Sequence, residues 1–160
     1  MNEASTRRKA KAYGRSAAMT LEASTADDGE TVNIEVAPRT EAGVQWASKV
    51  VVQASASELV LLAGLFLGLI PHLQLKRPGK GIDLERQPGI VFVKATAGAG
   101  RLYALPVTAA DSYYVGSVIL EQLGRHTPGL PSELLMAQLR GACALYCQKI
   151  ANREASAATN

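Results

Sequence analysis

Alternating apolar and polar residues in the first third of the chain predict β-strands. Val32, Ile34 and Val36 alternate with polar residues over residues 31 to 39, which is typical of a strand with one buried face and one wet face. Residues 19 to 24 indicate a shorter strand before it. Residues 44 to 54 are rich in β-branched side chains and predict either one long strand or two short ones.

The pattern becomes helical at residue 55. Ser55 and Glu58 have the S-x-x-E spacing of a capping box directly before an apolar run, so we expect a helix that reaches about Ile70 and ends at Pro71. The uninterrupted apolar stretch, residues 59 to 70, would span ~18 Å as a helix. A bilayer core is ~30 Å thick. The stretch therefore predicts a buried helix rather than a membrane span.

The rest of the chain repeats the same order of elements. Four short strands separated by Gly- and Pro-containing turns precede a second helix, which Thr108 and Asp111 can cap and which runs to about Leu123. Ser132 then predicts the start of a last helix, to about Arg153. One face of that helix carries Leu135, Leu139, Ala142, Cys143, Tyr146 and Ile150. The four strands are expected at residues 72–76, 81–86, 90–96 and 101–107.

This order predicts an α+β fold in which antiparallel sheet packs against helices on one side. Superposing Ser55 on Thr108 also superposes Glu58 on Asp111, so the order allows a duplicated strand-helix unit followed by a C-terminal helix. We expect a flexible basic arm over residues 1 to 16, one domain over residues 17 to 153, and a disordered tail over residues 154 to 160.

Charge and cysteine content narrow the class of protein. The chain of 160 residues has a formal net charge of +3, and its basic residues concentrate in the first 15 residues and between His72 and Arg101. Basic clusters are typical of contact with phosphates. Cys143 and Cys147 share a helix face without a surrounding Cys/His cluster, so we interpret them as reduced core thiols and expect no metal site.

Two segments resemble the Whirly-type single-stranded-DNA-binding proteins. "LYALPVTAADSYYVGSVILEQLGRHTPG" is similar to the end of that family's second repeat, and "VVVQASASELVLLAGLFLG" resembles the first-repeat counterpart. The similarity covers roughly residues 45 to 130 and lies in order and spacing. The family's Lys-Gly-Lys-Ala-Ala-Leu-type motif is missing from the early strand, because "PGKGIDL" falls in the wrong repeat. The resemblance implies two antiparallel sheets backed by helices, a homo-oligomer (commonly a tetramer), and single strands laid across sheet edges.

The hairpin "GIVFVKATAGAGRLYALPV", residues 89 to 107, is the strongest candidate site. A turn centred on Gly98 and Ala99 pairs Lys94 with Tyr103 and places four side chains on one outward face. These four are Phe92, Lys94, Arg101 and Tyr103. Aromatic rings among cations on an open sheet suit single-stranded nucleic acid, since each ring can stack a base and each cation can contact a phosphate.

Other positions extend this candidate interface. The further nucleic-acid-binding candidates are Lys76, Arg77, Lys80, Trp46, Lys49, Arg7, Arg8 and Lys9. An alternative remains open, because a Tyr opposite a Lys is also an ordinary cross-strand pair, and Phe92 can lie under a second subunit or the C-terminal helix. Asp83 and Glu85 on the adjoining strand would repel phosphate.

The sequence carries no recognisable catalytic motif: no P-loop, dinucleotide-binding fingerprint, HExxH or nucleophile elbow is present. We therefore expect a non-catalytic protein that binds single-stranded nucleic acid, DNA more than RNA, with low sequence specificity and without a cofactor or small-molecule substrate. We expect a cytoplasmic, nucleoid-associated homo-oligomer that does not bind membranes. The alternative is an oligomerising adaptor subunit of a larger protein assembly that binds no nucleic acid.

Overall fold

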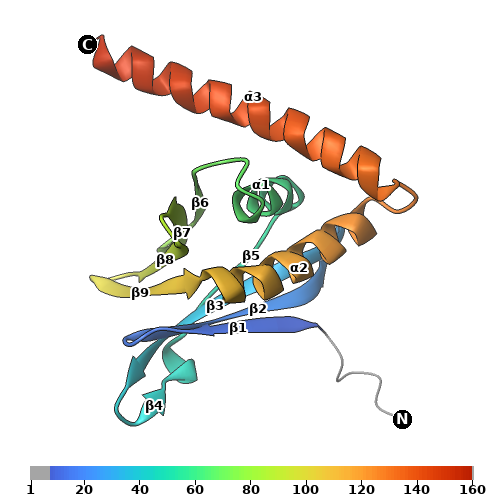
Figure 1. Ribbon diagram of the computed structural model, residues 1–160. Coiled ribbons are helices and arrows are strands. Elements are labelled where there is room, and N and C mark those ends of the chain that lie inside the picture. Colours follow the sequence, from blue (N-terminus) through green and yellow to red (C-terminus); the bar gives the residue numbers. More distant parts are fainter. Residues whose placement is uncertain (1–7, 160) are drawn as a thin grey trace, which may run out of the picture.

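A computed structural model describes residues 8 to 159. These residues form two antiparallel sheets and three α-helices (Figure 1). The fold is α+β, as predicted. The first sheet contains β1 (Lys9–Tyr13), β2 (Ala17–Ala26), β3 (Gly29–Thr40), β4 (Gly43–Val44) and β5 (Val50–Gln53), with a short 3-10 helix η2 (Trp46–Ser48) before β5. The second sheet contains β6 (His72–Arg77), β7 (Lys80–Gln87), β8 (Ile90–Ala97) and β9 (Arg101–Thr108). The helices are α1 (Ala56–Phe66), α2 (Ala109–His126) and α3 (Ser132–Ala158).

The sequence signals for the starts of α1 and α2 are confirmed. Ser55 Oγ accepts a hydrogen bond from the backbone N–H of Glu58, and the Glu58 carboxylate accepts one from the backbone N–H of Ser55. Thr108 Oγ1 accepts from the backbone N–H of Asp111 at 3.2 Å. Each sheet is therefore followed by a capped helix, which is the predicted duplicated order. The prediction of Ser132 as a cap is wrong, because the residue before α3 is Pro131 and no side chain caps that helix.

The first helix ends earlier than predicted. It stops at Phe66, and Gly68 takes a φ of +80°, the left-handed conformation that favours glycine. The backbone N–H of Leu69 then donates to the Gly64 carbonyl and that of Gly68 to the Leu65 carbonyl, which is the Schellman arrangement. The glycine, rather than Pro71, therefore sets the end of the helix.

The hydrophobic core lies between the two sheets and the helices. One face of the first sheet, with buried Met19, Leu21 and Ile34, is covered by α2, which runs along β1 to β3 beside α1 (Figure 1). The second sheet contributes buried Leu84 and Leu105 to the same core. In the described part of the chain, the opposite face of the first sheet has no covering helix, and the opposite face of the second sheet meets α3 only at β6. We call these the outer faces.

The long helix α3 crosses over α1 and extends beyond it (Figure 1). Leu139 and Cys143 are buried, and Leu135 and Tyr146 of the predicted stripe pack partly against the core. Burial raises the pKa of the Cys143 thiol, and the nearby Cys147 thiol adds to the effect. A Cβ built on Gly64 would lie 2.3 Å from Cys143 Sγ, so the two helices meet where α1 has no side chain.

Two predicted boundaries differ from the structure. The arm predicted to be flexible over residues 1 to 16 forms strand β1 from Lys9 to Tyr13, in which Ala10 and Ala12 are buried. The tail predicted to be disordered from residue 154 is helical to Ala158. In the part of the chain that the structure describes, no helix is both long enough and apolar enough to cross a membrane.

Candidate nucleic-acid interface

The β8–β9 hairpin has a different register from the one predicted. Ala97 pairs with Arg101, so the loop holds three residues, Gly98, Ala99 and Gly100. The two glycines have φ values of +45° and +74°, which non-glycine residues rarely adopt. Because the side-chain period of a strand is two, one extra loop residue moves every side chain of β9 to the other face.

The four predicted face residues are therefore divided between the two faces of the second sheet. Phe92 and Lys94 lie on the outer face, where they pair with Pro106 and Ala104. Tyr103 pairs with the buried Ala95 and packs against the core, and Arg101 is on the same side of β9. The prediction that Tyr103 and Arg101 share a surface with Phe92 is wrong.

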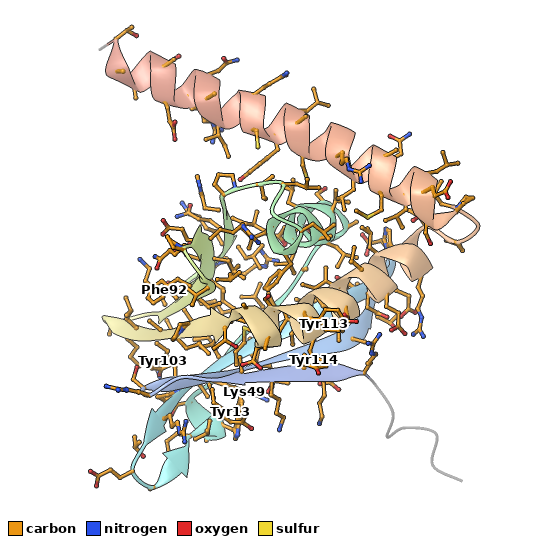
Figure 2. The ribbon with its side chains drawn as sticks, viewed as in Figure 1. Tyr13, Lys49, Phe92, Tyr103, Tyr113 and Tyr114 are labelled. Carbon is orange, nitrogen blue, oxygen red and sulfur yellow. The ribbon has the colours of Figure 1, made fainter. Side chains whose placement is uncertain are left out.

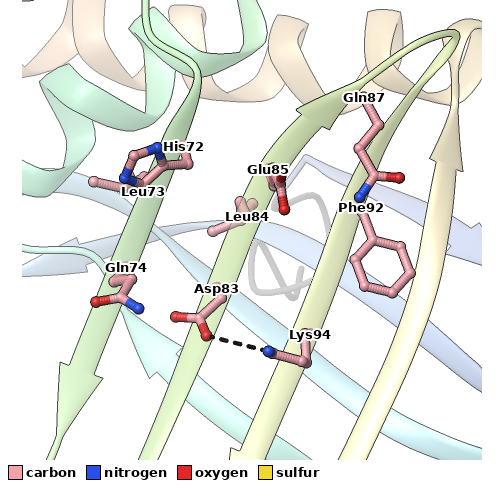
Figure 3. Close-up of a pocket in the computed structure, with 9 residues that line it drawn as sticks. All are labelled: His72, Leu73, Gln74, Asp83, Leu84, Glu85, Gln87, Phe92 and Lys94. Carbon is pink, nitrogen blue, oxygen red and sulfur yellow. Dashed lines mark ion pairs between the residues drawn. The ribbon is translucent and has the colours of Figure 1, made fainter. Parts of the chain in front are cut away.

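Phe92 and Lys94 line a pocket on the outer face of the second sheet, which we call the second-sheet pocket (Figure 3). It has a volume of about 390 Å³. Lys94 Nζ lies 4.0 Å from a carboxylate oxygen of Asp83, so this cation is already partnered. The pocket is lined by His72, Leu73, Gln74, Asp83, Leu84, Glu85, Gln87, Phe92 and Lys94.

The basic residues at the β6–β7 turn bind other parts of the protein. The Arg77 guanidinium forms an ion pair with Glu58 at 2.6 Å and donates to the Gln53 carbonyl at 2.7 Å. Lys80 Nζ donates to the Val51 carbonyl at 2.5 Å. Arg77 therefore joins the second sheet to β5 and α1, and Lys80 joins it to β5. Lys76 is exposed on the outer face of β6 and lines a second hollow beside α3.

The Glu58–Arg77 pair changes the ionisation of both groups. Burial alone would raise the pKa of Glu58, but hydrogen bonds from Arg77 and from the Ser55 backbone outweigh it, so the pKa lies below its ordinary value of 4.5. The hydrogen bond to Glu58 raises the pKa of Arg77. This pattern is typical of a structural ion pair at a helix start.

Of the predicted basic residues near the N-terminus, one is bound within the protein and one is exposed. Arg8 forms an ion pair with Glu121 of α2. Lys9 is exposed on β1 opposite Glu22 of β2. Arg7 lies outside the described residues, so its role stays a prediction.

A second cluster of rings and cations lies on the outer face of the first sheet. The Arg39 guanidinium carbon is 5.8 Å from the centre of the Tyr13 ring, and Lys11 Nζ is 6.0 Å from the centre of the Trp46 ring. These distances are within the range of cation–π contact. Lys49 is exposed nearby and pairs with Glu35 at 3.0 Å. Figure 2 shows Tyr13 and Lys49 together beside β1, apart from Phe92. We call Lys11, Tyr13, Arg39, Trp46 and Lys49 the first-sheet cluster.

Local sequence explains how this cluster forms. In the segment Lys-Ala-Lys-Ala-Tyr of β1, alanines alternate with longer polar side chains, so Ala10 and Ala12 face the core while Lys11 and Tyr13 face outward. Tyr13 pairs with Ala18 across to β2, and the small alanine leaves the ring 54% exposed. The cluster unites Trp46 and Lys49, which the sequence predicted, with Lys11 of the basic N-terminal segment and with Tyr13 and Arg39, which the sequence analysis missed.

The two outer faces differ in charge. Lys11 and Arg39 form no ion pair among residues 8 to 159, and with Lys9 and Lys49 they outnumber the carboxylates of Glu22 and Glu35. On the second sheet, Lys76 and Lys94 are balanced by Asp83 and Glu85. Within the described chain, no three His, Cys, Asp or Glu side chains gather as ligands of a metal ion would.

Comparison with known proteins shows which solved structures share this fold. No protein-family model matches the sequence, and no curated protein matches it significantly. Solved structures do match. The plant transcriptional regulator PBF-2 aligns with a TM-score of 0.59 and 18% identity over 76% of this chain and 83% of that one. WHY1 from Arabidopsis thaliana aligns with a TM-score of 0.57 and 17% identity over 76% of this chain and 92% of that one.

A third similar structure is MRP1/MRP2 of Trypanosoma bruciei, with a TM-score of 0.57 and 9% identity over 76% of this chain and 94% of that one. At these identities the comparison establishes the architecture of the chain. The protein therefore has a Whirly-like fold, as the sequence resemblance predicted.

Proposed function

We propose that this chain is a non-catalytic protein that binds single-stranded nucleic acid, mainly single-stranded DNA, with low sequence specificity, and that it acts in DNA metabolism. The observation that carries the proposal is the first-sheet cluster. It pairs two aromatic rings, Tyr13 and Trp46, with two cations, Arg39 and Lys11, on a sheet face without a covering helix. The Whirly-like fold supports the proposal, because the family that the sequence resembles binds single-stranded DNA.

The chemistry of the first-sheet cluster suits an unpaired strand. Each base that stacks on an aromatic side chain contributes ~1–3 kcal/mol, and this stacking tolerates any base because every base has a π-face. Cations beside the rings attract the phosphates and release condensed counterions, so affinity falls as salt is added. Low specificity follows from stacking and charge without contacts to base edges.

Fluorescence anisotropy with a labelled oligo-dT at low and high salt tests the proposal. We expect Tyr13→Ala to weaken binding about 5- to 100-fold through lost stacking. Arg39→Ala should reduce the slope of log affinity against log salt by about 1. Leu134→Ala and Arg140→Ala on α3 are the controls, because both side chains are exposed on a helix away from this face. Absence of binding at micromolar protein in low salt would favour the adaptor alternative.

We also propose that the chain forms a homo-oligomer and lies in the cytoplasm with the nucleoid. Tyr113 and Tyr114 of α2 are 72% and 62% exposed, and Leu145 of α3 is 69% exposed. Contiguous exposed apolar patches are typical of contact surfaces between proteins, and the Tyr113 and Tyr114 rings lie edge to face with their centres 5.4 Å apart. These exposed side chains are also the observation that favours the alternative function, an adaptor subunit in a larger assembly. The mass in solution, measured by light scattering, tests the homo-oligomer.

A further inference from the structure

The second-sheet pocket has a chemistry that differs from the first-sheet cluster. Its one lysine, Lys94, is already paired with Asp83. The Glu85 carboxylate lies between His72 and Phe92 in the cross-strand register, and among the described residues no side chain forms an ion pair or hydrogen bond with it. Such a pocket repels phosphate and attracts hydrogen-bond donors. It suits the base of a nucleotide rather than the backbone.

We propose that the second-sheet pocket holds a guanine base of the bound strand and gives the protein a preference for guanine at one position. This inference rests on the proposed function, which it refines. Phe92 is the stacking platform, Glu85 accepts from the donor edge of the base, and Gln87 donates to the carbonyl O6 of the base.

The register of the second sheet places these groups together. Glu85 of β7 pairs directly with Phe92 of β8, so their Cβ atoms are about 4.5–5.5 Å apart. Gln87 lies two residues after Glu85 on the same face of β7, which places the two residues about 6.5 Å apart along the strand. In Figure 3 the Gln87 amide points toward the Phe92 ring, and Glu85 lies beside that ring on the neighbouring strand. A base stacked on the Phe92 ring thus has its edge within reach of both side chains.

The donor pattern of guanine selects it over the other bases. Its Watson–Crick edge presents two adjacent donors, N1–H and the N2 amine, and a carboxylate can accept both in parallel. Adenine and cytosine each present one amine beside an acceptor that the carboxylate would repel. Thymine presents one N–H between two carbonyls. The Asp83 carboxylate lies 4.0 Å from Lys94 Nζ, whereas no ion pair of the described residues reaches Glu85, so Glu85 is the better-placed acceptor.

Competition among single-substituted oligonucleotides tests the inference. The probes are a labelled oligo-dT of 12 nucleotides and the same strand with one central thymidine replaced by guanosine, inosine, adenosine or cytidine. We expect guanosine to tighten binding by about 5-fold or more, the discrimination of one bidentate pair. Inosine lacks the N2 amine and should bind with intermediate affinity.

Protein variants identify the group that reads the base. Glu85→Gln should abolish the preference for guanosine over thymidine. Glu133→Gln, which removes the same charge from exposed α3, should keep it. Phe92→Leu retains an apolar side chain without an aromatic face and should weaken binding of every strand. The ratio of affinities is the readout, because loss of any negative charge tightens binding to all strands alike.

Each result decides between the claims. Equal affinities for all five strands, with oligo-dT bound, would overturn the guanine inference and leave the proposed function standing. A preference for cytidine, or a guanosine preference that survives Glu85→Gln, would also overturn it. Failure to bind any strand would refute the proposed function and the inference together.

Discussion

Alanine at position 64 would place a Cβ atom 2.3 Å from Cys143 Sγ, where α3 crosses α1. In an open helix the change from Gly to Ala stabilises a protein by about 1 kcal/mol. Here the added methyl overpacks a closed contact, which costs about 1–3 kcal/mol. Leu139 and Cys143 anchor α3 to the core, so the helix cannot move away freely. We expect Gly64→Ala to lower the free energy of unfolding.

A double-mutant cycle isolates this contact. Cys143→Ala removes the sulfur and should itself destabilise the protein by leaving a void. In the double variant the new methyl takes the place of the sulfur, so the two changes should compensate by about 0.5–3 kcal/mol. Gly141→Ala on α3 is the matched control, because a Cβ there meets no atom within 4 Å. We expect that variant to be as stable as the wild type or more stable.

Urea denaturation followed by circular dichroism measures these free energies, at one fixed protein concentration because an oligomer's stability depends on it. Additive effects in the cycle, or a Gly64→Ala variant that gains stability as Gly141→Ala does, would show that α3 does not dock against α1 at Gly64.

Three further results are expected. Arg77→Gln should cost stability at neutral pH through the lost pair with Glu58. Because the pKa of Glu58 is lowered in the folded protein, the pair's contribution is present above about pH 4.5 and fades as pH falls through the lower folded value, so urea midpoints of the two proteins should converge in acid. A difference in urea midpoint between the two proteins that is as large in acid as at neutral pH would contradict a contribution from this ion pair. Replacing Tyr113 and Tyr114 by Ser should lower the mass seen by light scattering without changing circular dichroism; an unchanged mass would place the contact elsewhere. Tyr103→Ala should destabilise the domain, since this ring packs against the core, and a stability equal to the wild type would contradict the observed register.

The parts of the fold that depend on local pattern could be predicted from the sequence. The capping box at Ser55 and the Thr108 cap act within four residues, so their signals are complete in the chain itself. The strands of the second sheet have clear alternation between Gly and Pro turns, and they lie where predicted. Strand β1 was missed because alanine is a weak strand former, although its alternation with Lys9, Lys11 and Tyr13 was visible.

The candidate site was harder to predict, because it depends on register and on contacts between distant segments. The segment Ala-Gly-Ala-Gly is compatible with a loop of two or three residues, and that single difference decides whether Tyr103 faces out or in. Arg77 and Lys80 each donate to a carbonyl of β5 that lies more than 20 residues away in the chain. Spacing along the sequence contains no information about such contacts.

Those two side chains also protect the protein from self-association through its backbone. Among the described strands β5 pairs with β3 alone, so its far side has carbonyls that a strand from another molecule could bind. Arg77 occupies the Gln53 carbonyl and Lys80 the Val51 carbonyl. Because a charged side chain already binds each of these carbonyls, a strand from another molecule cannot begin to pair with β5. We expect a variant without Arg77 and Lys80 to aggregate more readily during folding.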